Sequence, residues 1–168
     1  MSRIVAEIIG SNLISFIIWS FLELIIFSMF YLNFINKRKV WSLAILGILY
    51  MLIEFIYVDS NAITTFQSYA KVVTSGLMVI MVFIYFFEQI KGEFKMGKQD
   101  VYLHSSILSY FALEFILLLP MNFLIDSGSD LVFYVWMGHL LVLILFYLYL
   151  TNRICKNGKS QKRLHYGL

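Results

Sequence analysis

The chain has 168 residues, of which 61% are hydrophobic and 14% charged, and its formal net charge is +3. Soluble domains carry about 25% charged residues, so this composition, with a mean hydropathy of +0.82, excludes an ordinary soluble globular domain. Several apolar runs reach the ~20 residues that cross a bilayer as a helix. The sequence therefore predicts an all-α polytopic membrane protein, and no additional soluble domain is expected. The single cysteine, Cys155, cannot form a disulfide within the chain.

Five apolar segments are expected to cross the membrane as a helical bundle. The first runs directly into a basic cluster, which argues against a cleavable signal peptide. Short polar turns follow the second and fourth segments, and Ser60 or Asn61 in one turn and Ser129 or Asp130 in the other are suited to cap the next helix. The expected spans are about 13–34, 40–58, 66–88, 101–125 and 131–150, within a transmembrane domain of residues 1–152.

The distribution of charge predicts the orientation of these spans. Three basic clusters, at 37–39, 91–98 and 153–163, hold eleven of the thirteen Lys and Arg residues. The acidic turns lie on the opposite side and contain no Lys or Arg. Because Lys and Arg are concentrated in cytoplasmic loops, the pattern predicts a protein of the bacterial cytoplasmic membrane with its N-terminus outside and a basic cytoplasmic tail at 153–168. Such clusters indicate topology, and nucleic acid is not an expected partner.

Each span carries one ionisable group at least one turn from its ends: Glu23, Glu54, Lys71, Glu114 and His139. Counting ~1.5 Å per residue from the inner boundary, four of them lie about 17–21 Å deep, and Lys71 lies about 25 Å deep, where it could snorkel to the outer face. The sequence therefore predicts a polar layer near the middle of the membrane. Ionisable groups at this depth are costly, so they are expected to be paired, neutral or functional.

Two pairings follow from these depths. Glu54 and Lys71 are expected to form an ion pair that fastens the second and third helices, with a transport role as the alternative. Glu114 and His139 are expected to be within hydrogen-bonding reach, either as a buried structural pair or as a proton-accepting pair. Glu23 has no obvious cation, and a protonated acid is expected there, since burial favours the neutral form of a carboxyl group.

The second and fourth spans resemble each other. Tyr50-x3-Glu54 and Tyr110-x3-Glu114 lie sixty residues apart, and the spacing places each Tyr and Glu on one helical face. Two parallel helical hairpins would explain the similarity; chance similarity is the alternative, because Phe, Ile and Leu dominate the whole chain. Pro120 removes a backbone donor beyond Glu114 and predicts a kink in the fourth span.

Cofactor and catalytic motifs are missing from the sequence. His104 and His139 differ in depth by about 12 Å, which is too far for two axial ligands of one haem. Metal-ligand spacings, Gly-rich nucleotide loops and a nucleophile with its base are also absent. No cofactor, metal or catalytic residue is therefore expected, and an integral-membrane enzyme is the least favoured function.

The Tyr50-x3-Glu54 helix, the Ile107-Leu-Ser-Tyr110 segment and Trp136-x2-His139 resemble small uncharacterised bacterial multi-span membrane proteins, some of which are similar to membrane input modules of sensor kinases. The resemblance implies a sensory or signal-coupling role. The leading hypothesis is a non-enzymatic sensory or accessory subunit that couples the polar layer to a cytoplasmic partner. The alternative is a small transporter or proton-coupled channel subunit. The expected partners are the lipid bilayer and a cytoplasmic or membrane protein, with a homo-oligomer as a further option.

Overall fold

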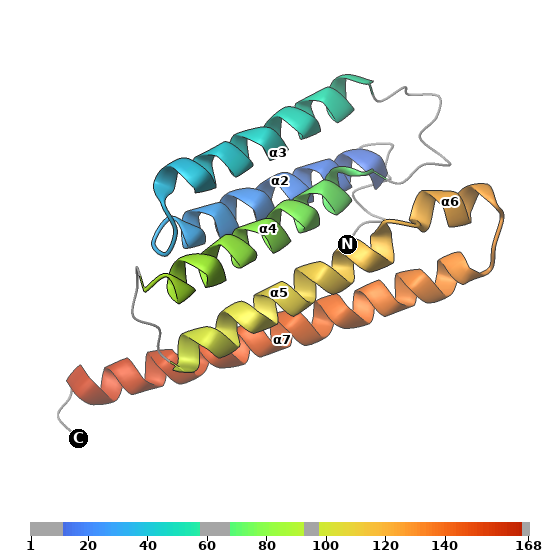
Figure 1. The fold of residues 1–168 in the computed structure, drawn as a ribbon. Coiled ribbons are helices and arrows are strands. Elements are labelled where there is room, and N and C mark those ends of the chain that lie inside the picture. Colours follow the sequence, from blue (N-terminus) through green and yellow to red (C-terminus); the bar gives the residue numbers. More distant parts are fainter. Residues whose placement is uncertain (1–11, 58–67, 93–97, 166–168) are drawn as a thin grey trace.

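The computed structural model describes the backbone of residues 12–57, 68–92 and 98–165, and in these residues all regular structure is helical (Figure 1). The helices are α2 (Asn12–Tyr31), α3 (Lys37–Tyr57), α4 (Ala70–Ile90), α5 (Lys98–Leu118), α6 (Met121–Asp126) and α7 (Leu131–His165). Four segments are long and apolar enough to cross a membrane: Lys37–Ile56, Ala70–Ile90, Asp100–Ile125 and Leu131–Arg153. The apolar segment of α2, Ser15–Tyr31, is shorter. The prediction of an all-helical chain with membrane-length apolar helices is confirmed for the described residues.

Helix α4 lies at the centre of the bundle. It packs against α2, α3 and α5, whereas α7 packs mainly on α5 and α6. In Figure 1 the five long helices α2, α3, α4, α5 and α7 run alternately in opposite directions, with α3 on one side of the bundle and α7 on the other. In the membrane-length segments, 56% of the α4 window but only 11% of the α7 window is buried. Side chains of α4 are therefore the ones that reach several other helices.

The distribution of polarity is the reverse of that in a soluble protein. Large apolar side chains are exposed along the outside of the bundle, for example Leu49 at 54% and Leu148 at 62%. Carboxylate, ammonium and imidazole groups are buried inside it. An exposed apolar surface of this extent is costly in water and favourable in lipid. The fold is therefore compatible with an integral membrane protein.

The predicted kink at Pro120 is a break between two helices. Helix α5 ends at Leu118, and α6 begins at Met121, with Pro120 at its N-cap position. Because proline has no N–H, the bond that would continue α5 at this point cannot form. The turn after α6 contains Gly128 at φ +63°, and the Ser129 hydroxyl accepts a hydrogen bond of 3.3 Å from the Leu131 N–H. Ser129 thus caps α7 as predicted.

The start of α4 and the end of α7 differ from the sequence predictions. Ser60 and Asn61, the predicted caps of the third span, lie outside the described residues; α4 begins instead at Ala70, whose N–H donates to the Ser68 hydroxyl at 3.0 Å. Helix α7 continues beyond the predicted span end at 150 to His165. The first part of the basic tail is thus a helical extension of the last span.

Candidate functional site

A buried lysine joins two glutamates from different helices. Lys71, in the first turn of α4, is 1% exposed, and its Nζ donates to Glu23 Oε2 of α2. The same Nζ lies 3.2 Å from Glu114 Oε1 of α5. Both carboxylates are buried, at 4% and 0% exposure. These three side chains, here named the charged triad, therefore connect the central helix to two of its neighbours by ionic contacts in a water-poor interior.

Two neutral hydroxyl groups complete the surroundings of Glu114. The Ser75 hydroxyl, one turn after Lys71, donates to Glu114 Oε2 at 2.6 Å. The Tyr110 hydroxyl, one turn before Glu114, donates to Oε1 at 2.9 Å. Glu114 thus has a donor on each oxygen besides the ammonium of Lys71. Hydrogen bonds of this kind stabilise the ionised form of a carboxyl group where water is excluded.

Glu23 is less fully satisfied than Glu114. Its second oxygen, Oε1, is 3.5 Å from the hydroxyl of Tyr147 on α7, which is a long hydrogen bond. The sequence predicted no cation for Glu23, and this prediction was wrong: Lys71, placed in the outer part of the third span, reaches it. The predicted snorkelling of Lys71 was wrong as well, because its ammonium is directed into the bundle between two carboxylates and is buried.

His139 of α7 faces the triad without a close hydrogen bond to it. Its Nδ1 is 3.9 Å from Glu114 Oε1 and has no hydrogen-bond partner among the residues that the structure describes. The side chain is 3% exposed, and Trp136 packs edge-on against the imidazole at a centroid distance of 5.8 Å. The predicted proximity of Glu114 and His139 is confirmed. The distance is too long for a direct hydrogen bond, so the pair is adjacent but not joined.

Glu54 does not belong to the charged triad. It shares a hydrogen bond with Tyr50 on its own helix, and its Oε2 has no partner among the described residues. The prediction of a Glu54–Lys71 ion pair was wrong, because the Lys71 ammonium pairs with Glu23 and Glu114 instead. The two Tyr-x3-Glu motifs do make the same bond within one helix, but only Glu114 reaches the central helix. The internal repeat remains a prediction.

A layer of apolar side chains lies between the triad and the ends of α2 and α4 that carry Tyr31 and Tyr85. At most 9% of any of these side chains is exposed, and their rings are in contact: Phe27 and Phe111 meet edge to face at 5.0 Å. This apolar layer consists of Leu24, Phe27, Met78, Met81, Phe111 and Phe146. On α5 the ten residues from His104 to Glu114 correspond to about 15 Å of helix, and the apolar layer fills part of this interval. The Tyr110 hydroxyl also lies in it, and the buried Ser28 hydroxyl of α2 lies next to Phe27.

His104 lies on the other side of the apolar layer, in an aromatic cluster. Its Nδ1 shares a hydrogen bond of 3.1 Å with the Tyr31 hydroxyl, and the Tyr85 ring is 3.8 Å away between centroids. Its Nε2 is buried without a partner among the described residues. This cluster could not be predicted from the sequence, since its members come from three helices at unrelated spacings.

A second ion pair lies at the C-terminal end of the central helix α4, the end that also carries Tyr85. Glu88, in the last turn of α4, is 2% exposed and accepts a hydrogen bond of 2.6 Å from Lys39 Nζ. Lys39 belongs to the first basic cluster, at the start of α3. Helix α4 therefore contacts the triad near its first residue and a basic inter-helix segment near its last, about 25 Å away at 1.5 Å per residue.

No group of three or more potential metal ligands occurs in the part of the chain that the structure describes. Comparisons with protein-family models, with curated proteins and with solved structures find no match for this chain. The functional argument therefore depends on the triad, its neighbours and the central helix that carries them.

Proposed function

We propose that this chain is a five-span integral protein of the bacterial cytoplasmic membrane, with its N-terminus outside and its C-terminus inside. It acts as a non-enzymatic sensory or accessory subunit, which couples the buried polar network to a cytoplasmic partner through the basic inner segments. The observation that carries the proposal is the pair of contacts made by α4. At one end of α4, Lys71 forms ion pairs with Glu23 and Glu114. At the other end, Glu88 forms an ion pair with Lys39.

This arrangement suits signal coupling because the triad has more than one charge state. Two carboxylates and one ammonium carry a net negative charge, and uptake of one proton makes the group neutral. Uptake or release of this proton changes the electrostatic attraction between Lys71 and the carboxyl groups of α2 and α5. Because α4 is buried on most of its surface, a shift at one end is transmitted along a stiff helix to the Glu88–Lys39 contact.

Paired spin labels at the inner end of the bundle test this coupling. One label is placed at Arg38→Cys, and the other on the native Cys155; both positions are exposed. On acidification, we expect the distance between the labels to shift by about 2–5 Å, the scale of helix displacements in switching proteins. The shift should disappear in Glu88→Gln and persist in the matched variant Glu54→Gln, which lies outside the triad. The same distance at both pH values would refute the coupling.

A cytoplasmic partner is tested separately from the motion. We expect such a partner to be recovered by crosslinking with the intact chain and lost when residues 153–168 are removed. Recovery of the same protein after removal of the tail would place its contact elsewhere and contradict this part of the proposal.

A small transporter or proton-coupled channel subunit is the second candidate, and His139 favours it. An unpartnered imidazole nitrogen 3.9 Å from a buried carboxylate is a geometry from which a proton could pass between the two groups. Proteoliposomes that show proton flux in the wild type and none in Glu114→Gln would support transport. Equal flux in the two proteins would exclude a role of Glu114 on the pathway.

A further inference from the structure

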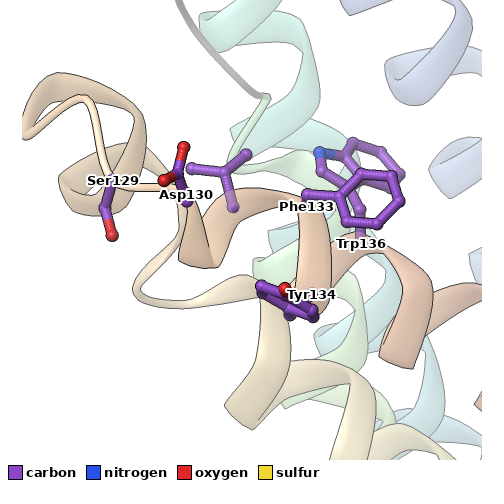
Figure 2. A pocket seen from close by; sticks show the side chains of 6 residues that line it. Ser129, Asp130, Phe133, Tyr134 and Trp136 are labelled. Carbon is purple, nitrogen blue, oxygen red and sulfur yellow. The ribbon is translucent and has the colours of Figure 1, made fainter.

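A pocket at the α6–α7 end of the bundle lies next to the residues that cover His139. Its volume is about 640 Å³, and its lining includes Ser129, Asp130 and Trp136. Figure 2 shows the Phe133 and Trp136 rings together on one side of the pocket, with Ser129 and Asp130 on the other. The pocket is therefore bounded by hydroxyl and carboxylate groups at the turn and by aromatic rings towards the bundle.

Trp136 belongs both to the pocket and to the buried network. It lies one turn before His139 on α7 and packs edge-on against the imidazole. It also contacts Phe16 of α2, with ring centroids 5.6 Å apart. Trp136 thus lines the pocket and contacts His139, which in turn is adjacent to Glu114.

The opposite end of the network is closed. From the triad towards His104 the chain places the apolar layer, whose six side chains are all buried and offer no hydrogen-bonding group. Water and protons are poorly accommodated in such a layer. The two sides of the triad therefore differ: Trp136 and His139 lie between it and a pocket that carries a hydroxyl and a carboxylate group, whereas the apolar layer lies between it and His104.

The unpartnered Nδ1 of His139 indicates which group exchanges protons. Buried polar atoms without a partner are uncommon and call for an explanation in terms of function or an unseen water. The groups facing His139 are Glu114 from α5, Lys71 from α4 and Trp136 from its own helix. Glu23 from α2 is linked to them through Lys71. A protonated imidazole would present an N–H to the carboxylate, and transfer of that proton leaves a neutral histidine beside a neutral glutamic acid.

We infer that the charged triad exchanges protons, through the His139 imidazole and past the Trp136 ring, with the membrane side on which the α6–α7 pocket lies, and that the apolar layer disfavours exchange with the side of His104. This inference deepens the proposed function: in the proposed topology, the exchanging side is the outside of the cell. His139 is the group that takes up the proton, and the Trp136 ring lies between His139 and the pocket.

The three tryptophans of the chain allow a direct test. Trp19 and Trp41 are both about half exposed on the bundle surface, so their replacement by phenylalanine leaves Trp136 as the sole indole. A protonated imidazole in contact with an indole quenches its fluorescence. In proteoliposomes, acidification of the pocket side should lower the Trp136 emission, and acidification of the opposite side should leave it unchanged. A membrane-impermeant maleimide on Cys155 identifies the opposite side in the same vesicles.

The control variant is His139→Gln, which keeps Trp136 and removes the titrating ring. Its emission should no longer respond to pH on either side. Equal responses to both sides, a response only from the Cys155 side, no response at all, or a full response in His139→Gln would each overturn the inference. Because the sides are assigned by Cys155 labelling, a failure of the N-out orientation in cells leaves this result intact. If the Trp136 emission does not respond to one side alone, the outcome of the spin-label test of α4 coupling is likewise unaffected.

Discussion

Replacement of Lys71 by methionine tests whether the charged triad holds the bundle together. Methionine keeps an unbranched apolar side chain of similar length, so the change mainly removes the ammonium. Lys71 is 1% exposed and contacts carboxylates of two helices. Removing one partner of a buried ion pair typically costs about 3–5 kcal/mol, because the remaining charge is left uncompensated. The hydroxyl groups of Ser75 and Tyr110 continue to stabilise Glu114, so we expect a loss of about 3 kcal/mol, at the lower end of that range.

Unfolding in mixed micelles, followed by circular dichroism at increasing denaturing-detergent content, provides the measurement. At neutral pH, Lys71→Met should be destabilised, and the loss should become smaller as the pH falls, because protonation removes the uncompensated carboxylate charge. The double variant Lys71→Met/Glu114→Gln should cost less than the sum of the two single losses at neutral pH. The matched control is Lys91→Met, whose ammonium is exposed and stacks on Phe87 at 4.6 Å; it should cost at most about 1 kcal/mol.

The reasoning fails if Lys71→Met unfolds at the same detergent content as the wild type at neutral pH. It also fails if the Glu114→Gln loss adds to that of Lys71→Met, because coupled partners in one network must give a non-additive cycle. A loss that is independent of pH would show that lost packing, and not charge, is responsible.

Three further outcomes are expected. Gly47→Ala should destabilise the bundle by about 1–3 kcal/mol, because an added Cβ would lie 2.6 Å and 2.8 Å from two leucine side chains, whereas Gly138→Ala, with open space, should not destabilise it. Tyr31→Phe should cost about 1 kcal/mol through loss of its 3.1 Å bond to a buried histidine, and Tyr102→Phe, on an exposed ring, should be neutral in the same unfolding assay. In cells, an impermeant maleimide should label Cys155 only after the membrane is opened; labelling of intact cells would contradict the C-in orientation.

The helices were predictable because their signal is local. Apolar runs of membrane length, a proline that interrupts one of them and a capping serine each act within a few residues, and the structure places α3, α4, α5 and α7 close to the predicted spans. The Tyr110–Glu114 bond was predictable for the same reason, since four residues form one turn. The depth count also brought His139 and Glu114 to the same level.

The pairing of Lys71 could not be derived from depth alone. Depth along the membrane normal gives one coordinate of a side chain, and partner choice depends on the other two, which are the order of the helices and the direction each residue faces. Glu54 has a suitable depth and lies in the adjacent segment of the sequence, but it is bonded within α3. Lys71 faces α2 and α5 because α4 is central, and centrality is a property of packing. The Tyr31–His104 and Lys39–Glu88 contacts depend on the same information.

The unequal surroundings of the two glutamates predict that they respond differently to removal of their charge. Glu114 accepts bonds from Ser75 and Tyr110 in addition to its contact with Lys71, whereas Glu23 contacts the lysine and makes one long bond among the described residues. If the triad holds one proton, the site with fewer donors is where a neutral acid costs least. Glu23→Gln, which imitates that acid, should therefore change the stability by less than about 1 kcal/mol, and Glu114→Gln should cost about 2–3 kcal/mol because donors arranged for an anion lose it.

Infrared spectra provide an independent check, since the carbonyl band of the protonated carboxyl should vanish in Glu23→Gln and remain in Glu114→Gln. The opposite ranking in both measurements would place the proton on Glu114, next to His139, and would make Glu23 the permanent partner of Lys71.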